Sequence, residues 1–83
     1  MTAPIVAVFD VLTDFLISNP SPDAVLSYQF PKDVERRAFD LMERNRVDNL
    51  NEDEKSELID FVRADDIMTL IKAKTRAKLK YSE

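Results

Sequence analysis

The fold is decided by residues 52–79, EDEKSELIDFVRADDIMTLIKAKTRAKL. Apolar residues recur in this stretch at intervals of three and four, which predicts a helix. Asn51 precedes the stretch and Glu54 follows three residues later, a spacing typical of the capping box that starts a helix. At a rise of 1.5 Å per residue, the predicted helix is roughly 40 Å long. Any fold for this chain must therefore accommodate one long C-terminal helix.

The apolar residues of this helix fall on two arcs. The first arc holds Leu58, Ile59, Val62, Leu70, Ala73 and Ala77. The second arc lies nearly opposite and holds Phe61, Met68, Ile71 and Leu79. A helix that is apolar on two sides needs to be covered on two sides, and three short helices can cover only one side over part of its length. We expect the second arc to face another chain. Alternatively, the helix kinks near Asp65 and Asp66, and both arcs face one core.

Three shorter helices are predicted before the long one. The first runs from Thr2 to about Ile17 and ends at Asn19, because Asn replaces Gly well in a left-handed cap. The second is short, starts at Ser21, and must end before Pro31, because the residue before a proline is pushed out of helical geometry. The third starts at Pro31 and extends to about residue 45. The predicted fold class is therefore all-α: a small four-helix domain, with one short helix and a long C-terminal helix.

Composition limits the chemistry that this chain can perform. Its 83 residues are too few for two cores, so residues 1–83 form a single helical domain. There is no Cys, which excludes disulfides, thiol nucleophiles and zinc fingers, and no His, the usual general base. Without Gly, the chain has no phosphate-binding loop of the common kinds. We predict no catalytic, cofactor-binding or metal-binding residue, no cofactor and no enzymatic activity.

Charge is distributed unevenly along the chain, whose net charge is −4. The last helix ends in a row of bases, namely Lys72, Lys74, Arg76, Lys78 and Lys80. This basic ridge suits an acidic protein surface or, as a less favoured partner, a nucleic-acid backbone. Bases at a helix C-terminus are also expected from the helix dipole alone. The same alternatives apply to Arg44 and Arg46 at the end of the third helix, which either complement the dipole or contact a carboxylate or phosphate.

The apolar start of the chain does not predict a membrane protein. Asp10 and Asp14 interrupt the run from Ile5 to Ile17, and the first base is Lys32, which does not fit a signal peptide or a membrane span. The absence of Cys permits a reducing compartment. We expect a cytoplasmic protein with no membrane partner.

Several segments resemble a widespread group of small bacterial proteins that are common in cyanobacteria. The shared segments are Phe15-Leu16-Ile17-Ser18, Pro20-Ser21-Pro22, Glu43-Arg44-Asn45-Arg46, Leu50-Asn51 and Leu70-Ile71-Lys72-Ala73-Lys74. Members of that group are uncharacterised, and some look like the small partner encoded beside a nuclease or toxin-like gene. The resemblance implies a binding role and nothing about catalysis. The chain departs from the group at Asp48, where Gly is usual, and at Asn51, where Ser or Thr is usual.

The sequence therefore predicts a non-catalytic module for protein–protein interaction, a small adaptor or regulator that binds a protein partner or itself as a homo-oligomer. The expected partner-binding residues are Phe61, Met68, Ile71 and Leu79 as apolar anchors, with Lys72, Lys74, Arg76 and Lys78 steering an acidic partner. The alternative is a nucleic-acid-binding regulator or an antitoxin-like partner of a nuclease or toxin.

Overall fold

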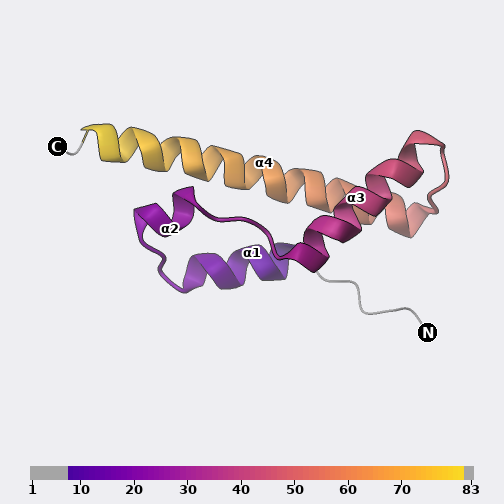
Figure 1. The fold of residues 1–83 in the computed structure, drawn as a ribbon, viewed down its shortest axis with the longest axis horizontal. Coiled ribbons are helices and arrows are strands. Elements are labelled where there is room, and N and C mark those ends of the chain that lie inside the picture. The colour runs from indigo at the N-terminus through magenta and orange to yellow at the C-terminus, as the bar shows by residue number, and fades with distance from the viewer. Residues whose placement is uncertain (1–7, 82–83) are drawn as a thin grey trace.

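A computed structural model describes residues 8–81 of the chain, which form four α-helices and, within that range, no strand. The helices are α1 (Val8–Ile17), α2 (Pro22–Leu26), α3 (Lys32–Arg46) and α4 (Glu52–Tyr81) (Figure 1). The predicted all-α fold with one short helix and a long C-terminal helix is confirmed. The predicted start of the first helix at Thr2 lies outside the described residues.

The long helix α4 is one continuous element of 30 residues. At 1.5 Å per residue it is roughly 45 Å long. It passes through Asp65 and Asp66 without a break and is drawn as a nearly straight rod in Figure 1. The alternative in which the helix breaks there is therefore wrong, and its two apolar arcs point to opposite sides of a single rod.

The start of α4 is fixed by the predicted capping box. The Asn51 side-chain Oδ1 accepts a hydrogen bond from the Glu54 backbone N–H at 2.8 Å, and Glu54 Oε1 accepts one from the Asn51 N–H at 3.1 Å. Two backbone donors that a helix start leaves without a partner are thus satisfied. The short α2 is capped in the same way by Ser21, whose Oγ accepts from the Ala24 N–H at 3.1 Å.

The chain turns without glycine at two left-handed positions. Asn19 follows α1 with φ 58°, as predicted, and Asp48 follows α3 with φ 55°. After α3, the Asp48 N–H bonds to the Asn45 carbonyl at 3.0 Å and the Asn49 N–H to the Arg44 carbonyl at 2.9 Å, which is a Schellman turn. Asp and Asn tolerate this backbone region better than other residues with a side chain. Asp48 therefore makes this turn without a Gly.

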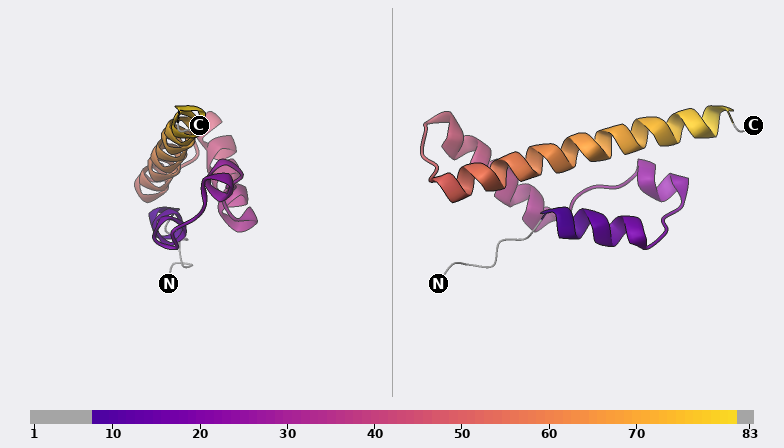
Figure 2. Two further views of the ribbon diagram at one scale, coloured as in Figure 1. Left: turned by 90° about the vertical axis from the view of Figure 1, so that its left-hand side faces the viewer. Right: turned by 180° about the vertical axis from the view of Figure 1, so that it is seen from behind.

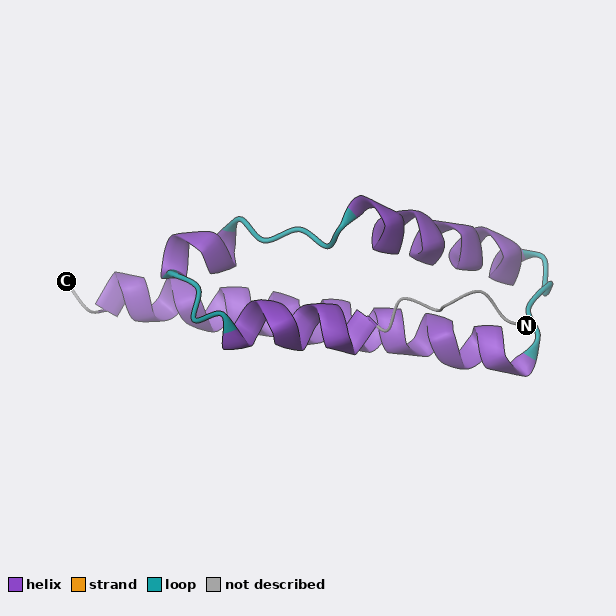
Figure 3. Cartoon of the chain, turned by 90° about the horizontal axis from the view of Figure 1, so that it is seen from below, coloured by secondary structure: helices purple, strands orange, loops and turns teal. Residues whose placement is uncertain are grey.

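All three shorter helices pack against α4, which is the spine of the molecule. The core consists of Val8, Leu12, Val25, Val34, Leu41, Phe61, Ala64 and Met68. The shape is elongated, with extents of 50 × 25 × 17 Å, and the radius of gyration is 15.0 Å, against about 12 Å for a compact chain of this length. Figure 3 shows α1, α2 and α3 distributed along α4 rather than wrapped around it.

Candidate interaction surface

One side of α4 carries apolar side chains that the rest of the described chain does not cover. Ile59, Val62 and Leu70 are 49%, 50% and 56% exposed. Ala73 and Ala77 continue the same row and are also exposed. These five residues are called the apolar stripe. Along the C-terminal part of α4, the helices α1 and α2 lie only on the opposite side of the rod (Figures 1 and 2). The stripe is therefore open to another molecule over several turns.

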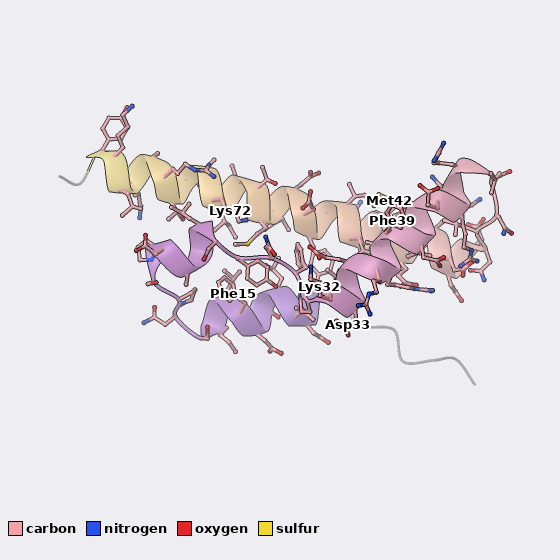
Figure 4. The ribbon with its side chains drawn as sticks, in the orientation of Figure 1. Phe15, Lys32, Asp33, Phe39, Met42 and Lys72 are labelled. Carbon is pink, nitrogen blue, oxygen red and sulfur yellow. The ribbon has the colours of Figure 1, made fainter. Side chains whose placement is uncertain are left out.

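Beside the stripe, α3 and α4 enclose an open apolar groove of about 490 Å³. Its walls include Phe39 and Met42 on α3 and Val62 on α4, so the groove and the stripe share a side chain. Phe39 is 62% exposed and Met42 46%, both high for large apolar residues. Figure 4 shows the two side chains where α3 crosses α4. Stripe and groove therefore adjoin at Val62, and the exposed Asp66 interrupts the stripe between Val62 and Leu70.

Acidic residues border this surface at the groove. Glu35 of α3 and Asp65 of α4 line it, and both are exposed. The other end of α4 is basic, and Lys74, Arg76 and Lys78 are exposed there, as predicted for a basic ridge. The two ends of the surface therefore carry charges of opposite sign.

The predicted apolar anchors need a correction. Phe61 and Met68 are 7% and 3% exposed and belong to the core, and Ile71 is half-buried against it. The three shorter helices cover this second arc, and only Phe61 still contributes to the lining of the groove between α3 and α4. Leu79, further along, is 38% exposed and lines an open hollow with Pro20 and Val25. The uncovered apolar side of α4 is therefore the first arc.

Lys72 also has an intramolecular role that the sequence did not indicate. Its Nζ donates a hydrogen bond to the Tyr28 backbone carbonyl at 2.7 Å. This contact ties α4 to the segment between α2 and α3 (Figure 4). Lys72 is half-buried, and its ammonium group is engaged within the chain. Of the predicted steering residues, Lys74, Arg76 and Lys78 are those on the exposed surface.

Arg44 contributes to the packing of α3 on α4. Its guanidinium lies 2.8 Å from the Glu54 carboxylate and 3.4 Å from that of Asp40. The hydrogen bond to Glu54 raises the pKa of Arg44 above its usual value. The Arg44 guanidinium, which was predicted to contact an external anion, is therefore paired with acids of its own chain. Arg46 is 74% exposed and pairs with Glu43 at 3.2 Å.

Arg37 and Glu57 form a second α3–α4 ion pair, which the sequence analysis missed. Arg37 Nε and NH2 donate to the two Glu57 carboxylate oxygens at 2.7 and 2.9 Å, a bidentate contact. Glu57 is buried, and the hydrogen bond to it raises the pKa of Arg37 above its usual value. Spacing within one helix could not have revealed these pairs, because Arg37 and Arg44 lie on α3 and their partners Glu57 and Glu54 lie on α4.

Metal and membrane sites were also considered. Within residues 8–81, no three Asp or Glu side chains are grouped closely enough to hold a metal ion. None of the described helices combines the length and apolarity needed to cross a membrane.

Comparison with known proteins finds no family model, no curated protein and no solved structure that matches this chain. The resemblance to small bacterial proteins therefore stays a prediction.

Proposed function

We propose that the chain is a non-catalytic protein–protein interaction module that works through the apolar stripe on α4 and the adjoining α3–α4 groove. The observation that carries the proposal is the half-exposed state of Ile59, Val62 and Leu70 in one row on a continuous helix. Scattered apolar residues are normal on a protein surface, but a contiguous patch of large ones marks an interaction site.

The rigidity of the surface supports the same proposal. The capping box fixes the first turn of α4, and the Arg37–Glu57 and Arg44–Glu54 pairs hold α3 across it. A surface that is already in its binding conformation loses little conformational entropy when a partner docks. Apolar side chains on such a scaffold are well suited to act as anchors, and the exposed bases of α4 can steer an acidic partner toward it.

The alternative function is nucleic-acid binding by a regulator or antitoxin-like protein. The exposed Lys74, Arg76 and Lys78 favour it. The net charge of −4 and the acidic border of the groove oppose it, because both repel a phosphate backbone at long range. Fluorescence anisotropy with a DNA duplex and a single-stranded RNA tests it. This alternative requires binding that weakens steeply with salt and is lost in the Lys74→Glu/Lys78→Glu variant.

Photo-cross-linking in the native host tests the interaction proposal. A photoreactive amino acid at position 70 should give defined higher-mass products, because Leu70 lies in the middle of the apolar stripe. A matched chain with the same group at Asp14, an exposed position on α1 away from the stripe and the groove, should not give them. A product of twice the chain mass would identify a second copy, and any other mass a different protein. If position 70 gives no product beyond those of position 14, the proposal is wrong.

A further inference from the structure

The apolar stripe is asymmetric along its length. Its N-terminal end has the large side chains Ile59 and Val62, and its C-terminal end has the small ones Ala73 and Ala77. When two such helices pair antiparallel, large residues lie opposite small ones at the two ends of the stripe, where the helices can approach closely. A parallel pair would set large against large at one end and leave a gap between alanines at the other. The stripe is therefore complementary to itself only in the antiparallel direction.

The charges of α4 have the same directional property. Residues 52–66 contain seven acids and two bases, a net charge of −5, and residues 67–81 contain five bases and no acid, a net charge of +5. Glu54 and Glu57 are already paired with Arg44 and Arg37 of α3, and Lys72 is bonded to Tyr28, so the remaining acids and bases carry the polarity. The helix dipole favours such charges only within the first and last turn, so it does not account for a polarity that extends over the whole helix. Antiparallel pairing places each acidic half against a basic half, whereas parallel pairing places like charges together.

A specific register follows if the two stripes are aligned at their midpoints. The midpoint is residue 68, halfway between Ile59 and Ala77, and the two-fold axis passes beside it. Ile59 then lies opposite Ala77 of the second copy, and Val62 close to Ala73. Asp66, which lies in the stripe between Val62 and Leu70, lies opposite Leu70 of the second copy and about one turn from Lys74 of that copy. The basic half of the second copy also passes beside the acid-bordered groove, near Phe39.

The area available is appropriate for a stable pair. Five large side chains on this surface are between 46% and 62% exposed, namely Phe39, Met42, Ile59, Val62 and Leu70. Together they present on the order of 500 Å² of apolar surface, if a large side chain exposes roughly 200 Å² when free. The two alanines and the aliphatic stems of the flanking lysines bring the contact toward the roughly 800 Å² per partner of a standard interface.

From these observations we infer that the partner of the apolar stripe is a second copy of this chain, bound through an antiparallel α4–α4 contact with two-fold symmetry. This inference rests on the proposed function and specifies its partner. The isologous contact closes on itself, so the assembly is a dimer and not a filament.

Cysteine cross-linking tests the direction of pairing, since the natural chain has no Cys to interfere. Two single variants, Ile59→Cys and Ala77→Cys, are given tags of different mass, mixed and oxidised. In the antiparallel dimer, positions 59 and 77 face each other, while the two copies of either position lie about 27 Å apart along the axis. The expected disulfide joins the two different chains and not two identical ones. Disulfides between identical chains would indicate parallel pairing and overturn the inference.

Sedimentation equilibrium of the natural chain provides the second readout. We expect twice the chain mass of 9.6 kDa at micromolar concentration. Asp66→Lys and Lys74→Glu should each weaken dimerisation about tenfold, because each reverses two symmetry-related charge contacts, and the double variant should recover most of the loss. Circular dichroism confirms that each variant is folded.

Failure of this inference can be told apart from failure of the proposed function. A natural chain that sediments as a monomer overturns the dimer, as does a double variant that is no tighter than the single ones. A monomer whose position 70 still cross-links to a different protein in the native host would retain the proposed function with another partner. If neither a dimer nor a cross-linked product at position 70 is found, both proposals are wrong.

Discussion

Met68 and Leu70 lie two residues apart on α4 but on opposite sides of it, and replacing each with Ala measures which side is the core. Met68 is 3% exposed, and truncating a buried Met costs about 2–5 kcal/mol. We expect about 2–3 kcal/mol, at the low end, because a small core can relax around the cavity. The whole domain has a free energy of unfolding of about 4–12 kcal/mol at this length, so Met68→Ala removes a large share.

Leu70 is 56% exposed, so Leu70→Ala removes less than half of the burial of a core Leu. The expected loss is at most about 0.5–1 kcal/mol. Urea unfolding followed by circular dichroism measures both variants, at low protein concentration and high salt so that self-association does not contribute. With an m-value near 1 kcal/mol/M, the urea midpoint should fall by about 2 M or more for Met68→Ala and by about 1 M or less for Leu70→Ala. Equal shifts, or a larger shift for Leu70→Ala, would refute the assignment of the two sides.

Three further predictions concern the turn, an acid and a tyrosine. Asp48→Ala should lower the free energy of unfolding by about 1 kcal/mol, because Ala tolerates a φ of 55° poorly. Asp48→Gly should not lower it, because Gly adopts this φ freely. Thermal unfolding measures both variants, and equal losses of stability would contradict the account. The hydrogen bond from the Asn51 N–H and the contact with Arg44 lower the pKa of Glu54 below its ordinary 4.5. These contacts therefore stabilise the folded chain above pH 4.5, and this contribution is lost as the pH falls through the folded-state pKa of Glu54. Glu54→Gln should therefore lose less stability on acidification than the natural chain, and an unchanged pH profile would exclude this contribution. The Tyr28 hydroxyl is buried without a hydrogen-bond partner among residues 8–81. Tyr28→Phe should therefore raise the free energy of unfolding, measured with urea, by about 1 kcal/mol. A loss of that size would mean that the hydroxyl has a hydrogen-bond partner in solution.

The helix boundaries followed from local chemistry and were therefore predictable. Asn51 with Glu54, Ser21, and Asn19 act through hydrogen bonds or backbone angles within a few residues, and the structure has each in its predicted role. The continuity of α4 was left open because Asp65 and Asp66 are tolerated in a helix but do not require one. Only the packing of the other helices along the rod distinguishes a straight helix from a broken one.

The candidate surface was less predictable, because periodicity shows that α4 has two apolar arcs but not which arc its own chain covers. Phe61 was predicted as an exposed anchor on the second arc and Ile59 was placed on the first arc, yet Phe61 is in the core and Ile59 is on the surface. The exposure of Phe39 and Met42 depends on how α3 crosses α4, and that crossing involves the core contacts of Val34 and Leu41 and the Arg37–Glu57 pair, whose partners are 20 residues apart. Contacts at that separation are not encoded in local spacing.

The central claim is that another protein chain covers the apolar stripe when the molecule is at work. Its most direct test is the reactivity of a thiol at position 70, measured as the rate at which Leu70→Cys reacts with N-ethylmaleimide in the native host and in dilute purified protein. Asp14→Cys, exposed on α1 and away from the stripe and the groove, is the control. The account predicts that position 70 is protected in the cell relative to dilute protein, while position 14 reacts at similar rates in both. Equal reactivity of position 70 in the two settings, matching the control, would contradict it.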